Sequence, residues 1–157
     1  MNFWQRADEN PTWIRKYGCA LMSTLKKLDD ILDITKAVNF TPEDWYNIFR
    51  DMNIITVSGM MNWQMLPAKF PIAIGVYLYN GKHRDVSFVT NDSIISVDSM
   101  DKIGYQSHYL SVEKVVDSED VLAYDPWVDG VVSVMDEYGK VSIDDSIYTI
   151  INIEKVE

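Results

Sequence analysis

The chain has 157 residues, and its 24 acidic against 14 basic side chains give a net charge of −10 at neutral pH. This balance argues against nucleic acid and anionic membrane surfaces as partners, because both bind through Lys and Arg. One cysteine and two histidines exclude a disulfide framework and a Cys-rich zinc site and leave little for a histidine metal cluster, so we expect no metal and no cofactor.

The first predicted helix runs from about Cys19 to Asp33. Leucines recur in it at spacings of four, three and four residues and form one apolar stripe, whereas the lysines and aspartates at 26, 27, 29, 30 and 33 lie largely off that stripe. The stripe consists of Leu21, Leu25, Leu28 and Leu32. Gly18, directly before the helix, is a natural place for a tight turn.

The second predicted helix lies within residues 40–52. Thr41 is a good N-cap residue, Pro42 fits the first helical position, and the acidic residues that follow favour the positive end of the helix dipole. The predicted buried face consists of Trp45, Ile48, Phe49 and Met52.

From about residue 72 the apolar pattern changes to a period of two, which predicts strands. Turn-type clusters such as NGK, TND, DSED and DEYG separate the strands and favour antiparallel pairing. The predicted strands are 72–79, 85–89, 93–98, 108–116, 120–125, 131–135 and 148–156. Helices followed by an antiparallel sheet indicate an α+β fold.

The chain contains no linker, repeat or low-complexity segment, so we assign residues 1–157 to one domain. No apolar run approaches the length of a membrane span. The first residues lack the basic and apolar regions of a secretory signal. We therefore expect a cytoplasmic protein, or one associated with a virion or host cell, whose oligomeric state the sequence does not reveal.

Cys19 stands at the start of the first predicted helix, directly after Gly18. Helix starts hold unpaired backbone N–H groups and the positive end of the helix dipole, which stabilise a thiolate and can bind an oxyanion. Free cysteine is also among the most buried residue types. The position alone therefore leaves two alternatives, a nucleophile and a core residue.

A second group of candidate residues lies within 107–127. His108 opens a predicted strand, a turn follows, and the next strand ends in Asp125, Pro126 and Trp127. The first residue of one hairpin strand lies near the last residue of the other, so we expect His108 and Asp125 within hydrogen-bonding distance. A carboxylate that orients an imidazole beside a thiol is the arrangement of a catalytic triad.

A rival histidine–aspartate pair, His83 and Asp98, has the same layout one hairpin earlier. His83 follows the turn signal NGK between Lys82 and Arg84, which is typical of a solvated loop. We prefer the later pair because Pro-Trp follows its acidic residue and because the segment HYLSV alternates cleanly.

The motifs, taken in order, resemble those of the papain-like cysteine peptidases, and more closely their bacteriocin-processing peptidase-like branch, which includes many small phage and bacterial proteins. The matching segments are WQRADENPTWIRKYGCALMS (4–23), TPEDWYNIF (41–49), GMMNWQML (59–66), FPIAIGV (70–76), the strand at His108, and YDPW (124–127). The resemblance implies a papain-like α+β fold, with N-terminal helices packed on a C-terminal antiparallel sheet.

The resemblance also implies a role for four residues. Cys19 is expected to be the nucleophile, His108 the general base and acid, and Asp125 the group that orients His108. Gln5 is expected to donate to the oxyanion beside the backbone N–H of Cys19, with Gln64 and Gln106 as less favoured substitutes. The chain departs from many family members in having Ala-Leu-Met instead of Gly-Pro-Thr after the cysteine, and in an extra hairpin around 83–99.

We therefore expect a cysteine peptidase or amidase that cleaves an amide bond in a peptide, or in the peptide part of peptidoglycan, through an acyl-thioenzyme. Two other functions stay open. The chain can be an inactive phage or bacterial binding or structural protein on the same fold. It can also be an acyl transferase of the transglutaminase kind, which uses the same triad.

Overall fold

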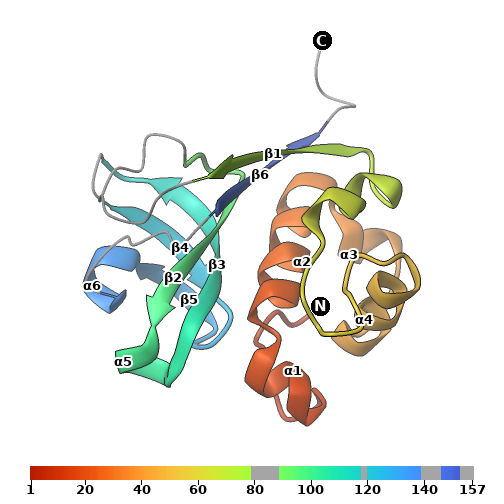
Figure 1. Cartoon of the computed structure of the whole chain (residues 1–157), viewed down its shortest axis with the longest axis horizontal. Coiled ribbons are helices and arrows are strands. Elements are labelled where there is room, and N and C mark those ends of the chain that lie inside the picture. Colours follow the sequence, from red (N-terminus) through yellow and green to blue (C-terminus); the bar gives the residue numbers. More distant parts are fainter. Residues whose placement is uncertain (79–88, 118–119, 139–145, 153–157) are drawn as a thin grey trace.

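Helices form one half of the molecule and an antiparallel sheet the other (Figure 1). The computed structural model describes residues 1–78, 89–117, 120–138 and 146–152. The helical half comprises α1 (Thr12–Tyr17), α2 (Cys19–Leu32), α3 (Ile34–Ala37), α4 (Pro42–Asp51) and the 3₁₀ helix η1 (Trp63–Ala68). The sheet half comprises β1 (Ile72–Leu78), β2 (Ser93–Ser99), α5 (Met100–Ile103), β3 (Tyr105–Val115), β4 (Val121–Asp125), β5 (Gly130–Ser133), α6 (Val134–Tyr138) and β6 (Ser146–Asn152).

The six described strands form one sheet in the order β1-β6-β2-β3-β4-β5, and every neighbouring pair is antiparallel. Strands β2 to β5 follow one another as neighbours, as short loops predict. The last strand, β6, lies between β1 and β2. The mixture of helices and an antiparallel sheet confirms the α+β class.

Both predicted helices are present, and a capping box fixes the start of α4. At the start of α4 the Thr41 hydroxyl accepts from the Asp44 N–H at 3.1 Å, and the Asp44 carboxylate accepts from the Thr41 N–H at 2.9 Å. This reciprocal pair satisfies two backbone donors that the helix itself leaves free. Trp45 and Phe49 are buried as expected, and the rest of the predicted face is partly buried against the same core.

The predicted strand 131–135 is wrong in its second half. Strand β5 ends at Ser133, and α6 begins at Val134. The Asp120 carboxylate accepts from the Ser133 hydroxyl at 2.7 Å and from the Met135 N–H at 3.0 Å. The Ser133 hydroxyl in turn accepts from the Asp136 N–H at 3.3 Å. Two side chains therefore cap the start of α6, and a strand pattern cannot reveal such capping.

The other predicted strands agree with the sheet to different extents. Strand β3 begins at Tyr105, which pairs with Ser99 beyond a bulge, so the expectation that His108 opens its strand is wrong. The predicted strand 85–89 lies outside the described residues except for Val89, as does the end of the predicted strand 148–156.

The sheet carries a hydrophobic core on each of its two faces. Ile94 belongs to the core that α2, α4 and η1 build, whereas its neighbour Ile95 belongs to a second core that Val134 of α6 helps to cover. Successive residues of a strand point to opposite faces, which explains this division. The helices thus pack on one face, and the smaller core lies on the other.

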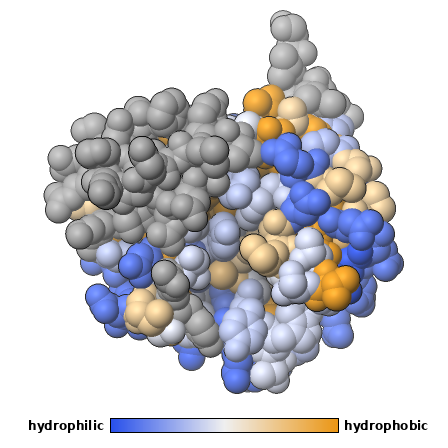
Figure 2. All heavy atoms as spheres, viewed as in Figure 1, coloured by the Kyte–Doolittle hydropathy of each residue, from blue (hydrophilic) through white to orange (hydrophobic). Residues whose placement is uncertain are grey.

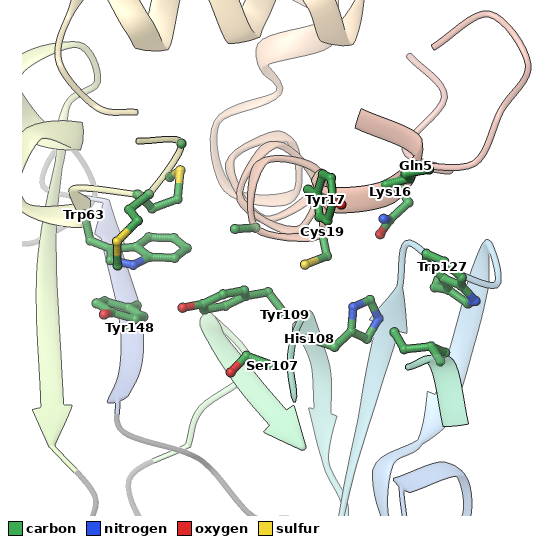
Figure 3. Close-up of a pocket in the computed structure, with 15 residues that line it drawn as sticks. Gln5, Lys16, Tyr17, Cys19, Trp63, Ser107, His108, Tyr109, Trp127 and Tyr148 are labelled. Atoms are coloured by element: carbon green, nitrogen blue, oxygen red, sulfur yellow. The ribbon is translucent and has the colours of Figure 1, made fainter. Parts of the chain in front are cut away.

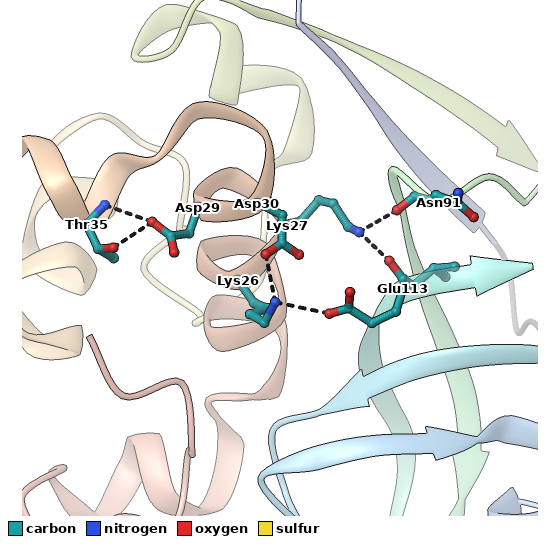
Figure 4. Close-up of polar contacts among 8 residues, drawn as sticks. Lys26, Lys27, Asp29, Asp30, Thr35, Asn91 and Glu113 are labelled. Carbon is teal, nitrogen blue, oxygen red and sulfur yellow. Dashed lines mark hydrogen bonds and ion pairs between the residues drawn. The ribbon is translucent and has the colours of Figure 1, made fainter.

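Polar contacts fix α2 against the sheet (Figure 4). Lys26 bridges Asp30 at 2.7 Å and Glu113 of β3 at 3.0 Å. Lys27 is only 2% exposed, so its predicted place away from the buried face is wrong. Its ammonium group donates to the backbone carbonyls of Asn91 and Val112, which supply the hydrogen bonds that a buried charge needs.

The outer surface has a mixed character. In Figure 2, apolar spheres stand in small groups among hydrophilic ones on the helical side of the described surface, and scattered groups of this kind are normal on proteins. Within the described parts of the chain, none of the helices combines the length and the apolar character needed to cross a membrane.

Candidate active site

A pocket of about 400 Å³ lies where the start of α2 faces β3 and the end of β4 (Figure 3). Its lining includes Gln5, Cys19, His108 and Trp127, so three of the four predicted site residues reach it directly. Asp125, the fourth, is 1% exposed and lies behind His108.

The sharp junction between α1 and α2 places Cys19. The Gly18 N–H donates to the Ile14 carbonyl at 2.9 Å, and a Cβ atom on Gly18 would lie 2.5 Å from that oxygen. Glycine is therefore required for close packing, not for a left-handed backbone. Cys19 is the first residue of α2, where backbone N–H groups have no intrahelical acceptor, and it is half-buried at the pocket wall.

His108 and Asp125 make the contact that the hairpin pattern predicts. Nε2 of His108 lies 2.6 Å from Oδ1 of Asp125, and each residue is 1% exposed. Because Ser111 pairs with Tyr124, His108 and Asp125 point to the same face as diagonal neighbours. The bond to Nε2 leaves the other ring nitrogen of His108 for the pocket.

Asp125 accepts two further hydrogen bonds that hold its carboxylate in place. The Trp127 N–H donates to Oδ1 at 2.9 Å, and the Tyr138 hydroxyl of α6 donates to Oδ2. Both oxygens of this buried carboxylate are therefore engaged, as burial of a charge demands. Sequence reasoning missed Tyr138, because it falls in the cluster DEYG that reads as a turn.

The same contacts set the charges of the site. Burial favours neutral imidazole, but hydrogen bonds with Asp125 and Cys19 outweigh it and raise the pKa of His108 to about 9. Burial alone would raise the pKa of Asp125, yet its hydrogen bond with His108 brings the net pKa below its ordinary value. At neutral pH the site therefore holds an imidazolium ion and a carboxylate. The hydrogen bond with Cys19 places its sulfur beside the His108 ring, and Figure 3 shows both side chains at the same pocket.

Gln5 connects the N-terminal segment to both halves of the site. Its backbone N–H donates to the Pro126 carbonyl at 2.9 Å, and its side-chain Nε2 donates to the Arg15 carbonyl at 3.3 Å. The residue is 1% exposed, although it lines the pocket beside Cys19. An amide nitrogen carries two hydrogens, so the bond to Arg15 leaves one of them unused.

The two alternative site residues whose side chains the structure describes, Gln64 and Asp98, do not line this pocket. Gln64 is exposed on η1 and does not line it. Asp98 is exposed on β2, where its carboxylate accepts from the Met100 N–H at 3.0 Å. His83 lies outside the described residues, and of Gln106 only the backbone is described.

The fold and the site thus define an α+β protein in which a thiol, an imidazole and a carboxylate lie next to one another at one pocket. No protein-family model matches the chain, and no similar protein was found among curated proteins or solved structures.

Proposed function

We propose that the chain is a papain-like cysteine hydrolase that cleaves a peptide amide bond through an acyl-thioenzyme on Cys19. The observation that carries the proposal is the buried 2.6 Å contact between His108 and Asp125 at a pocket that Cys19 also lines. A nucleophile on a helix start that faces a histidine–carboxylate pair on a sheet supports the papain-like assignment.

The first half of the reaction transfers the acyl group to sulfur. The Cys19 thiolate attacks the substrate carbonyl carbon, and the electron pair of the carbonyl bond moves to oxygen. The backbone N–H of Cys19 and Nε2 of Gln5 are the donors available to that oxyanion. The carbon–nitrogen bond then breaks, and the His108 imidazolium gives its proton to the departing amine.

The second half releases the acid. Neutral His108 takes a proton from a water molecule as its oxygen attacks the thioester carbon. The carbon–sulfur bond breaks, the product leaves as a carboxylic acid, and the thiolate and imidazolium are restored. Asp125 holds the ring in one orientation throughout, and its charge stabilises the imidazolium in both halves.

Hydrolysis of internally quenched peptides, including peptidoglycan stem peptides, tests this proposal. We expect turnover by the unmodified chain and its loss in Cys19→Ser and His108→Gln variants that retain their circular dichroism spectrum. Asp98→Asn is the matched control, because Asp98 is exposed outside the pocket. Turnover that persists in Cys19→Ser would refute the nucleophile. An added primary amine separates hydrolysis from acyl transfer, since only the latter gives an amide-linked product.

A further inference from the structure

Apart from Cys19, the charged side chains in the described lining of the pocket are positive, although the chain as a whole is acidic. They are Lys16 and His108, against a net charge of −10 for the chain. Close by, the Arg6 guanidinium lies 4.7 Å from the centre of the Trp127 ring. Asp125 adds no free negative charge to the pocket, because it is 1% exposed and hydrogen-bonded to the His108 imidazolium.

The opposite wall of the pocket is aromatic. Trp63 stacks on Tyr148 with ring centres 4.2 Å apart and an angle of 22°, and its ring centre lies 5.6 Å from that of Tyr109. Met60, which is 70% exposed, stands at the same pocket. Figure 3 places Trp63 and Tyr148 on one side of Cys19, and Lys16 and Trp127 on the other.

We propose that this pocket selects anionic peptides, which place a large apolar side chain on the Trp63–Tyr148 wall and a carboxylate near Lys16. The proposal rests on the hydrolase function for the peptide nature of the ligand. The net negative charge of the chain does not oppose it, because salt at physiological strength screens charges beyond about 8 Å. Because the His108 imidazolium is already paired with Asp125, a carboxylate in the pocket responds mainly to Lys16.

Binding to the Cys19→Ser variant tests the selection without turnover. Three fluorescent peptides share one Phe and differ only in flanking residues, which are Glu, Gln or Lys. We expect the Glu peptide to bind about three- to fivefold more tightly than the Gln peptide, as a single exposed ion pair allows, and the Lys peptide to bind most weakly. Replacing the Phe by Gly is expected to weaken binding about tenfold.

Charge reversal identifies the responsible residue. Lys16→Glu should abolish or invert the preference for the Glu peptide. Lys36→Glu is the matched control, since it changes the net charge equally. The Lys36 side chain is exposed on α3, at the far end of α2 from Cys19. The control should keep the original order.

Equal affinities for the three peptides, no binding of any peptide, or the same inversion by Lys36→Glu would overturn the proposal. These results are distinguishable from a failure of the hydrolase function. Cleavage of peptides without any charge preference would support the hydrolase function and refute the selection. Binding in the expected order of affinity without any cleavage would support the selection and refute the hydrolase function.

Discussion

Replacing Tyr138 by Phe removes one hydroxyl group from the site and leaves the ring in place. That hydroxyl donates to Oδ2 of Asp125, whose side chain is buried. Removing one hydrogen-bond donor from a buried, charged acceptor lowers the free energy of unfolding by about 2 kcal/mol. For a chain of this length, such a loss lowers the melting temperature by about 4–8 °C.

The substitution should also change the titration of His108. Burial and the hydrogen bond with Asp125 raise the pKa of Tyr138, so the phenol remains a donor at neutral pH. In Tyr138→Phe, the buried Asp125 carboxylate has one donor fewer than in the unmodified chain, so it depends more on the proton of His108. The imidazolium is therefore retained to higher pH, and we expect the pKa of His108 to rise from its value of about 9.

The assay uses the fact that the chain has two histidines. In a His83→Gln background, His108 is the sole histidine, and its ring protons can be followed by NMR across the titration. Tyr46→Phe is the control, because the Tyr46 hydroxyl contacts Arg50 on α4, away from Asp125. An unchanged or lowered pKa of His108 in Tyr138→Phe, together with an unchanged melting temperature, would refute the reasoning.

Three other predictions concern stability and the placement of the nucleophile. The pKa of His108 is about 9 in the folded chain against an ordinary 6.5, so protonated His108 stabilises the fold by about 3 kcal/mol. This contribution is complete below about pH 6.5 and is lost as pH rises through 9. Urea unfolding at several pH values measures it, and the same dependence of stability on pH in His108→Gln would contradict it. Gly18→Ala should cost about 1–3 kcal/mol and slow alkylation of Cys19, whereas Gly130→Ala, whose Cβ meets nothing within 4 Å, should do neither. Lys27→Met leaves the buried Val112 carbonyl and the partly buried Asn91 carbonyl without this donor and should lower the melting temperature by several degrees, and an equal or higher value would contradict that.

The sequence predicted the parts of the site that depend on local pattern. Gly18 and Cys19 precede a leucine stripe, and α2 begins at Cys19 as expected. The contact between His108 and Asp125 follows from one hairpin, whose two strands are joined by a short turn. Such features need only a period and a turn signal, so they are visible without the rest of the chain.

Long-range contacts were beyond reach of the same reasoning. The insertion of β6 between β1 and β2 pairs segments that are far apart in the sequence. The burial of Lys27 depends on two carbonyls that the sheet brings to it, and the approach of Tyr138 to Asp125 depends on the cap that Asp120 gives to α6. No residue pattern near these positions marks such partners.

The rate of Cys19 alkylation by iodoacetamide as a function of pH tests the central claim most directly. The claim is that an imidazolium with a pKa of about 9 stands beside the Cys19 sulfur. We expect Cys19 to react faster than a free cysteine at pH 6, and that advantage to disappear in His108→Gln. A rate at pH 6 no greater than that of a free thiol, or one that His108→Gln leaves unchanged, would contradict the account.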